Sequence, residues 1–286
     1  WSTDSPTATM KELKNLLLSQ PHRIQSGHAN ISVTGITADS RRVVAGSVFV
    51  AIKGVQTNGH QFIQNAVSQG ATCIVCEYCD VNIPDNICVV LVENAGHSFG
   101  WLMSAWYNYP TRELNVVGVT GTNGKTTTTL LTYHLIKEAG LDVGLAGNVG
   151  KSWAGQLVDK DHDWWVIETS SFQIDGFMCF RPNIAVLTNI TPDHLDRYEY
   201  QLDNYIISKM GIFKMMTSRD KAIYYKEDLL SQKGLQIKPA KASAFWISLE
   251  EKQEKGGFSD GELLIINAAD KTAKIPVSGL SIQGKH

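Results

Sequence analysis

The stretch Val116–Thr129, VVGVTGTNGKTTTT, constrains this chain more than any other. A short apolar run, Val116–Val119, leads into Gly121–Thr126, and a segment with helical spacing follows as far as Gly140. This order predicts a strand, a glycine loop and a helix. Glycines in such a loop let backbone N–H groups turn inward onto phosphate oxygens, and the helix N-terminus adds its partial positive charge. The stretch therefore indicates a site for nucleotide phosphates.

Single residues of the loop have predicted roles in that site. Lys125 would reach the β- and γ-phosphates, and the Thr126 hydroxyl would bind Mg²⁺. The strict pattern has a glycine where this chain has Val119, so the loop is a variant. A helix-capping turn is the alternative interpretation. The predicted cofactor-binding residues are Gly121, Thr122, Asn123, Gly124, Lys125, Thr126 and Thr127.

Length and charge limit the remaining possibilities. A chain of 286 residues suggests roughly two domains. A net charge of −2 leaves no electrostatic footprint for nucleic acid. No apolar run reaches the roughly 18 residues that a membrane span needs. The first nine residues lack the basic start and apolar centre of a signal peptide, so we interpret them as a tag or upstream remnant ahead of Met10.

The five cysteines are odd in number and too sparse for a disulfide framework, which indicates a reducing cytoplasm. Cys73, Cys76 and Cys79 form a CxxCxxC pattern, which is also typical of metal or iron–sulfur sites. The surrounding residues are strand formers, however, and residues three apart on a strand point to opposite faces. The strand interpretation is therefore favoured, and a cluster would require a loop there.

The residues before the glycine loop predict a small α/β unit, which we assign to a domain at 10–111. We expect helices at 11–19, 61–68 and 94–107, and strands at 31–36, 47–52, 71–77 and 89–92. Two polar loops at 37–42 and 53–60 stand out, and either ligand binding or ordinary turn chemistry explains them. A linker at 110–113 then leads into a second domain at 112–286.

In the second domain, polar residues follow a series of apolar strands. Strands are expected at 142–145, 164–167 and 184–187, and their alternation with helical segments predicts a parallel sheet wound by helices. Asn148, Glu168 and the pair Asp193-His194 follow the ends of these strands. Ligands of such sheets bind outside the carboxyl ends of the strands. This convergence with the glycine loop predicts one site at that edge.

Each of these polar residues also has a simpler interpretation. Glu168 is either a Mg²⁺ ligand or a surface carboxylate that caps a turn. His194 could be structural, and Asp193 could pair with Arg197 four residues later. Lys209 is the unusual member of an amphipathic helix expected at 203–216, and a snorkelling lysine is its alternative. After Asp220, short strands are expected at 222–225, 244–247, 263–267 and 273–277.

Five motifs in order resemble those of the Mur ligases, the ATP-dependent enzymes that add amino acids to UDP-N-acetylmuramic acid in bacterial peptidoglycan synthesis. They are GTNGKTT, GNVGKSWA, ETSSFQID, NITPDHLDRY and the lysine of NYIISKMGIF. The resemblance extends from Met10 to His286. The central segments are most similar to the branch that adds D-glutamate. ITADSRRVVAGSVFVAIKG and TNGHQFIQNAVSQGAT instead resemble the UDP-binding domain of the branch that adds diaminopimelate or lysine, which indicates a chimera or fusion.

The resemblance implies roles for single residues. Lys125, Thr126 and Thr127 would hold the phosphates, and Thr126 with Glu168 would hold one Mg²⁺. His194 with a carbamylated Lys209 would hold a second Mg²⁺, which makes Lys125, His194 and Lys209 the implied catalytic residues. The residues implied to face the uridine diphosphate are Asp39, Ser40, Gln56, Thr57 and Asn58. Those implied to lie near the muramoyl substrate or the metals are Asn148, Ser170 and Gln173.

The implied activity is ATP-dependent ligation of D-glutamate to a UDP-N-acetylmuramoyl substrate through an acyl phosphate. The implied protein is a cytoplasmic bacterial monomer without nucleic-acid or membrane partners. The family's C-terminal domain, which carries the incoming amino acid, would start after His286, so we expect the chain by itself to be inactive. The alternatives are a diaminopimelate or lysine ligase, a folylpolyglutamate synthetase, and an incomplete fragment that binds ATP and a UDP-sugar.

Overall fold

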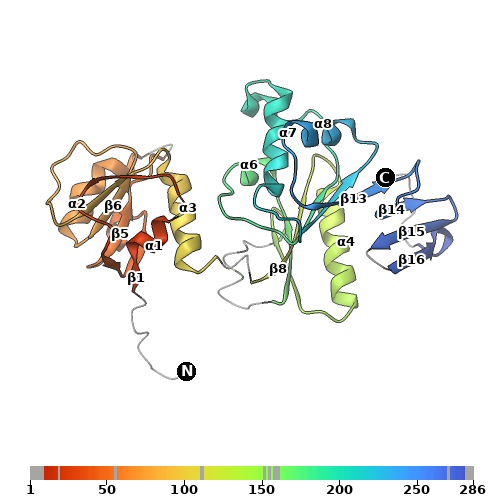
Figure 1. Ribbon diagram of the computed structural model, residues 1–286, viewed down its shortest axis with the longest axis horizontal. Coiled ribbons are helices and arrows are strands. Elements are labelled where there is room, and N and C mark those ends of the chain that lie inside the picture. Colours follow the sequence, from red (N-terminus) through yellow and green to blue (C-terminus); the bar gives the residue numbers. More distant parts are fainter. Residues whose placement is uncertain are drawn as a thin grey trace. The chain divides into compact units, whose positions relative to one another are not determined.

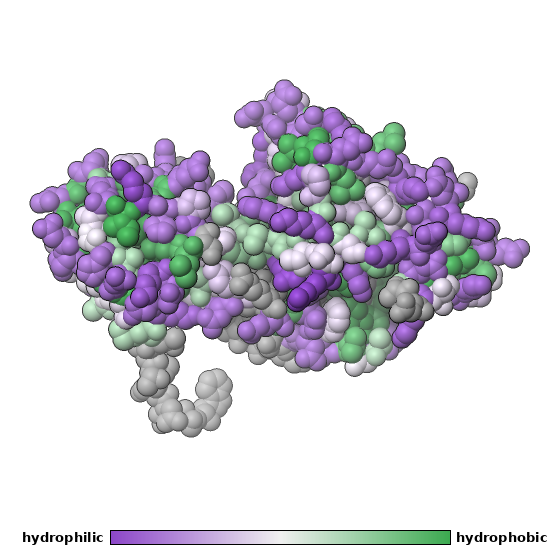
Figure 2. Space-filling model, viewed as in Figure 1, coloured by the Kyte–Doolittle hydropathy of each residue, from purple (hydrophilic) through white to green (hydrophobic). Residues whose placement is uncertain are grey.

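The computed structural model describes residues 10–18, 20–54, 57–109, 113–150, 153, 156, 162–268 and 271–280. The chain divides into two compact units, Trp1–Pro110 and Thr111–His286, here called unit 1 and unit 2 (Figure 1). On the face shown in Figure 2, hydrophilic residues surround small apolar patches. Within the described ranges, no helix has the length and apolar character needed to cross a membrane.

Unit 1 is built on a five-stranded sheet. Its elements are β1 (Lys11–Glu12), α1 (Leu13–Leu17), β2 (Arg23–Ser26), β3 (Ser32–Val33), β4 (Gly35–Thr37), β5 (Ser47–Val50), α2 (Ile63–Ser68), β6 (Cys73–Cys76), β7 (Cys88–Leu91) and α3 (Ala95–Trp106). The strand order is β2-β7-β6-β5-β4, with β4 to β7 parallel and β2 antiparallel to β7. β1 and β3 form a separate antiparallel pair.

The sheet of unit 1 has a hydrophobic core on each face. Cys73 and Val75 pack with residues of α1 and α3, whereas Ile74 and Cys76 pack with residues of α2. This alternation confirms the prediction that Cys73 and Cys76 lie on a strand and point to opposite faces. The side chains of these two cysteines are therefore buried in two different hydrophobic cores.

Unit 2 is built on a nine-stranded sheet, and the strand that leads into the glycine loop is an interior strand of it. Its strands are β8 (Asn115–Thr120), β9 (Val143–Gly147), β10 (Trp164–Glu168), β11 (Ile184–Leu187), β12 (Lys221–Tyr225), β13 (Ser243–Ser248), β14 (Gly256–Ser259), β15 (Leu263–Ala268) and β16 (Lys271–Pro276). The order is β16-β15-β14-β13-β12-β11-β8-β10-β9. The strands from β9 to β14 are parallel, and β15 and β16 extend the sheet as antiparallel strands.

Helices cover both faces of this sheet. They are α4 (Lys125–Glu138), α6 (Ser171–Ile174), α7 (Leu202–Met210) and α8 (Leu229–Ile237). Tyr133 and Ile136 of α4 pack on Val117 and Val119, on one face of β8. On the opposite face of the sheet, α7 contributes Ile206 to a second core together with residues of β11 and β12 (Figure 1). The predicted α/β class, with parallel sheets wound by helices, is confirmed.

Several expected boundaries differ from the structure. The helix expected at 203–216 ends at Met210, and the 3-10 turn η5 (Gly211–Phe213) follows. A Cβ on Gly211 would lie 2.6 Å from Cγ2 of Ile174, so this turn packs closely on α6. The strand expected at 31–36 is divided between β3 and β4, which belong to different sheets. The helix expected at 11–19 is reduced to α1, and Ser19 lies outside the described residues.

The elements not expected from the pattern include β1, β2, α6, α8 and β14. Two of the four residues of β14 are glycines, which are poor strand formers. Gly256 has φ +133°, and a Cβ there would lie 1.9 Å from the carbonyl oxygen of Trp246 on β13. The strand therefore depends on close approach to its neighbour, which a local pattern of apolar residues does not reveal.

Candidate functional site

The glycine loop joins β8 to α4, and its two inner glycines are needed for different reasons. Gly121 has φ +146°, and a Cβ there would lie 2.0 Å from Oγ1 of Thr188. Gly124 has φ +76° and precedes the first residue of α4, with no atom within 4 Å of the Cβ position. Packing against the end of β11 thus requires Gly121, and backbone conformation favours glycine at position 124.

The N-terminus of α4 presents donors and positive charge at this loop. The N–H groups at the start of a helix have no carbonyl partner within the helix. In α4 the N–H of Thr128 donates to the Gly124 carbonyl at 3.0 Å, so the N–H groups before it are available to a ligand. Thr126 and Thr127 are exposed there. The Lys125 ammonium donates to the Thr122 carbonyl at 2.8 Å, which folds its charge over the loop. An anion at this position would meet backbone donors, hydroxyls and an ammonium group.

The loop after β11 holds the glycine loop in shape. Asn189 accepts from Thr122 N–H at 2.9 Å through its carbonyl and from Asn123 N–H at 2.9 Å through Oδ1. The Thr188 hydroxyl donates to the Asn123 carbonyl at 2.7 Å. Asn189 was not among the predicted site residues. Its position directly after an apolar strand was the available signal.

Glu168 ends β10, the strand hydrogen-bonded to β8, and its side chain is buried at 1% exposure. Oε1 accepts from Asn148 Nδ2 at 3.0 Å. The other oxygen, Oε2, is buried and has no hydrogen-bond partner among the residues that the structure describes. Such an oxygen needs an explanation, and a hard cation with oxygen ligands supplies one. The alternative of a surface carboxylate is wrong, and the donor chemistry fits Mg²⁺.

Lys209 of α7 points inward to the glycine loop. Its side chain is 2% exposed, and Nζ donates to the Gly121 carbonyl at 2.5 Å. Nζ also lies over the Tyr205 ring, 5.3 Å from its centroid. Burial, reinforced by the charge of Lys125, lowers the pKa of Lys209 to about 7. The snorkelling interpretation is therefore wrong, because the amine is enclosed and contacts the predicted site.

His194 and Asp193 lie in the loop that follows β11. The backbone of His194 is left-handed, with φ +49°. Its side chain is exposed, and Nε2 is 3.6 Å from Oδ2 of Asp193. Arg197 lies over the Phe172 ring, 4.5 Å from its centroid, and not against Asp193. The suggested helical pair of Asp193 and Arg197 is thus replaced by other contacts, because 195–198 form a 3-10 turn.

Ser170 and Gln173, predicted to lie near the substrate, form a capping box for α6. The Ser170 hydroxyl accepts from Gln173 N–H at 3.3 Å, and Gln173 Oε1 accepts from Ser170 N–H at 2.9 Å. Both side chains therefore have a structural task at the start of this short helix. They nevertheless follow Glu168 directly, so α6 begins beside the end of β10.

The described residues among those predicted to face uridine diphosphate lie in loops at the carboxyl ends of β4 and β5. Asp39 receives two hydrogen bonds from the Arg41 guanidinium, which hold its pKa at about 2. Asn58 Oδ1 accepts from His60 N–H at 3.1 Å, and the His60 ring is stacked on Tyr78 at 4.1 Å. The remaining predicted residues are Ser40, which is buried, Thr57, which is exposed, and Gln56, which lies outside the described residues.

The fold and the site define an α/β protein with a glycine loop for phosphate groups beside a buried carboxylate. Two family descriptions match the chain: "Mur ligase middle domain" over residues 119–279 and "Mur ligase family, catalytic domain" over residues 32–100. The chain belongs to the Mur ligase family.

Curated relatives and solved structures extend this assignment. UDP-N-acetylmuramoylalanine--D-glutamate ligase of Christiangramia forsetii is 43% identical over 183 residues, which are 64% of this chain and 40% of that protein. UDP-N-acetylmuramoyl-L-alanyl-D-glutamate--2,6-diaminopimelate ligase of Parabacteroides distasonis is 34% identical over 224 residues, 71% of this chain and 46% of that protein. This chain thus spans less than half the length of either relative.

A solved structure of a UDP-N-acetylmuramoyl-L-alanyl-D-glutamate--2,6-diaminopimelate ligase has a TM-score of 0.69 with this chain. The match covers 93% of this chain and 59% of the solved one, at 20% identity. At that identity the likeness supports the shared fold alone.

Proposed function

We propose that this chain is the nucleotide-binding part of an ATP-dependent ligase that adds D-glutamate to a UDP-N-acetylmuramoyl substrate. One observation carries the proposal: the glycine loop, the free oxygen of Glu168 and the buried amine of Lys209 meet at one edge of the sheet in unit 2. The names of the D-glutamate ligases among its relatives support the choice of amino acid.

In this proposal unit 2 binds ATP through the glycine loop. N–H groups of the first turn of α4 bind phosphate oxygens, and Lys125 leaves the Thr122 carbonyl for the β- and γ-phosphates. Thr126 and Thr127, exposed on that turn, supply hydroxyl groups. The substrate carboxylate attacks the γ-phosphorus, the bond to the bridging oxygen breaks, and ADP leaves with an acyl phosphate formed. Positive charge around the loop neutralises the charge that builds up on the phosphoryl group.

Thr126 and Glu168 are the residues that would hold a first Mg²⁺, and His194 with carbamylated Lys209 would hold a second. When bound, Mg²⁺ would withdraw charge from phosphate oxygens. Glu168 fits this role because Oε2 is buried and has no donor among the residues that the structure describes. Lys209 fits carbamylation because only a neutral amine reacts with CO₂, and a pKa of about 7 leaves much of it neutral near neutral pH.

The second half of the reaction joins the amine of the amino acid to the acyl phosphate. The amine attacks the carbonyl carbon, a tetrahedral intermediate forms, the nitrogen loses a proton, and phosphate leaves as the amide forms. The oxyanion of that intermediate needs donors, and the same glycine loop is the source in unit 2. Unit 1 would bind the uridine diphosphate through the loops that carry Asp39 and Asn58.

A second candidate is the ligase that adds diaminopimelate. The relative with that name aligns with 71% of this chain, a larger share than the 64% for the D-glutamate ligase of Christiangramia forsetii. The two candidates differ in the acceptor, which ends in alanine in one name and in D-glutamate in the other. Calorimetry with each UDP-N-acetylmuramoyl acceptor decides between them, and tighter binding of the dipeptide acceptor would favour diaminopimelate.

The ATP assignment is tested by Lys125→Ala in calorimetry with a non-hydrolysable ATP analogue and Mg²⁺. Loss of a charged partner should weaken binding about tenfold or more. The matched control is Lys137→Ala, on the last turn of the same helix, where the ammonium lies 5.7 Å from the Tyr133 ring. Equal affinity in the Lys125 variant and the wild type would contradict the assignment.

A further inference from the structure

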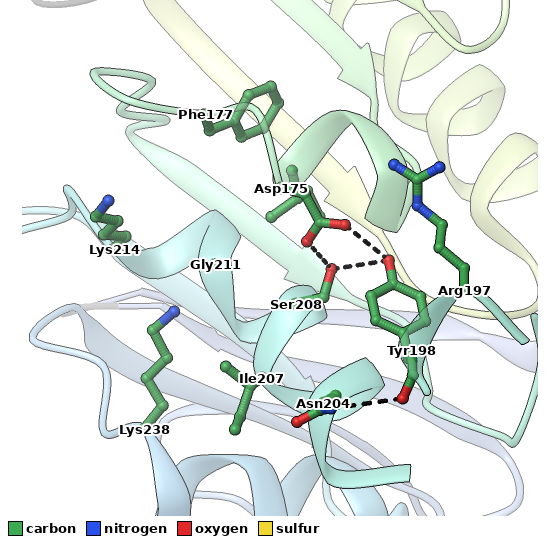
Figure 3. Close-up of a pocket in the computed structure, with 11 residues that line it drawn as sticks. Asp175, Phe177, Arg197, Tyr198, Asn204, Ile207, Ser208, Gly211, Lys214 and Lys238 are labelled. Carbon is green, nitrogen blue, oxygen red and sulfur yellow. Dashed lines mark hydrogen bonds between the residues drawn. The ribbon is translucent and has the colours of Figure 1, made fainter. Parts of the chain in front are cut away.

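Unit 2 contains a pocket of about 580 Å³ that is separate from the glycine loop (Figure 3). It lies between α6, α7 and the end of α8, and its polar lining consists of Asp175, Arg197, Tyr198, Asn204, Ser208, Lys214 and Lys238. None of these residues belongs to the site proposed for ATP. The volume is within the range of roughly 300 to 1,000 Å³ that small-molecule sites occupy.

The centre of the pocket is a carboxylate held by two hydroxyl groups. The Ser208 hydroxyl donates to Oδ1 of Asp175 at 2.5 Å, and the Tyr198 hydroxyl donates to Oδ2 at 3.0 Å. The two hydroxyl oxygens are 3.1 Å apart. Within the described part of the chain, Asp175 has no ion pair. Among the described residues, neutral donors thus satisfy this carboxylate, and it forms no ion pair with Lys214 or Lys238.

Three cationic side chains surround this centre. In Figure 3, Lys214 and Lys238 lie on one side of Ser208 and Arg197 lies on the other. Neither lysine has a carboxylate within ion-pair distance in the described ranges. Burial lowers the pKa of Lys238, and the charge of Lys214 lowers it further against the opposing effect of Asp175. The positive charge of the exposed Lys214 therefore acts on the half-buried Lys238, and a bound anion would stabilise both charges.

We propose that this pocket binds a small organic anion through Lys214 and Lys238. The recognised group is a phosphate or a carboxylate, because both accept hydrogen bonds from two ammonium groups at once. Apolar walls formed by Ile174, Phe177 and Ile207 receive the carbon part of the ligand. Three cations against one carboxylate leave the pocket with a positive balance, which attracts an anion.

The test is an NMR titration of the whole chain with inorganic phosphate and, separately, with citrate. Ionic strength is held constant with sodium chloride, so that general screening is the same at every point. We expect saturable shifts at the amides of Ser208 and Gly211 in at least one titration. The anion that saturates at the lower concentration identifies the recognised group as phosphate or carboxylate.

The variants Lys214→Gln and Lys238→Gln remove one charge each and should weaken binding about tenfold. The matched control is Lys233→Gln, since Lys233 of α8 pairs with Asp203 and does not line the pocket. Thermal unfolding shows whether each variant is folded, and Lys214, which is exposed, is the safer of the two. Unchanged affinity in folded variants, absence of saturable shifts with both anions, or shifts confined to Gly121–Thr127 would each overturn the proposal. The glycine-loop assignment would be unaffected by any of these results.

Discussion

The amine of Lys209 is buried against the glycine loop, and its titration gives the protein a specific pH dependence. Its pKa is about 7 in the folded chain and 10.5 in its ordinary state. Between these values the unfolded chain binds more protons than the folded one, so stability rises with pH. We expect the free energy of unfolding to increase by about 2 kcal/mol from pH 7 to pH 9 through this residue alone.

The measurement is urea unfolding of the wild type and of Lys209→Met at pH 7, 8 and 9, in buffers free of CO₂ and Mg²⁺. The variant has no amine to titrate, so its advantage over the wild type, whatever its size at pH 7, should shrink as pH rises. Other titrating groups cancel in this comparison. A constant difference between the two proteins would show that the Lys209 amine keeps an ordinary pKa.

The two glycines of the phosphate loop should respond differently to alanine. At position 121 the new methyl group would meet Thr188 at 2.0 Å and the Asn189 backbone at 3.0 Å, so we expect Gly121→Ala to cost about 3 kcal/mol or more. At position 124 no atom lies within 4 Å, and only the left-handed backbone opposes Gly124→Ala, at about 1–2 kcal/mol. Chemical denaturation of both variants measures these costs. Similar losses would mean that packing on β11 is not decisive.

At the scale of elements, Asp220 joins the amino ends of β11 and β12, opposite the candidate site. Arg181 donates to both of its carboxylate oxygens, at 2.9 and 3.0 Å, and Thr217 N–H donates at 2.6 Å. Burial raises the pKa of Asp220, but these hydrogen bonds outweigh it and leave the pKa lowered. The resulting stability is present above the ordinary pKa of 3.8 and is lost as pH falls through the lower value.

We expect Asp220→Ala to destabilise unit 2 by about 3 kcal/mol, because the Arg181 guanidinium would lose its partner in a half-buried place. Nucleotide affinity should not change, since the glycine loop follows the carboxyl end of β8 and Asp220 lies at the amino end of β12. Denaturant unfolding and calorimetry on the same preparation measure the two quantities. A variant with wild-type stability, or one that is stable but cannot bind nucleotide, would contradict this division of roles.

Element positions were partly predictable and partly not. The apolar runs of β8, β10 and β11 are continuous, which is typical of buried parallel strands, and the glycine loop marks the start of α4. α7 ends earlier than its apolar pattern suggests, because Gly211 packs on Ile174. Ser170 and Gln173 read as polar residues after a strand, and they cap α6. Local sequence does not distinguish a cap from a ligand contact, because both use the same hydroxyl and amide groups.

For the whole molecule, the proposed function assigns different ligands to the two units. Titration with UDP should shift NMR signals in unit 1, especially near Asp39 and Asn58. Titration with a non-hydrolysable ATP analogue and Mg²⁺ should shift signals of Gly121–Thr127 in unit 2. UDP shifts confined to residues beyond 112 would contradict UDP binding by unit 1. ATP shifts confined to unit 1 would contradict ATP binding by unit 2.

The sequence by itself determined the order of strand, glycine loop and helix, and the presence of polar residues after apolar strands. These features are local, because glycine conformations and apolar periodicity act over a few neighbouring residues. Only the tertiary structure decided that Lys209, 88 residues after Gly121, donates to its carbonyl. It also decided that Glu168 keeps one buried oxygen without a donor among the described residues, and that three cations line one pocket with Asp175. Burial and strand pairing set these contacts, and both depend on segments far apart in the chain.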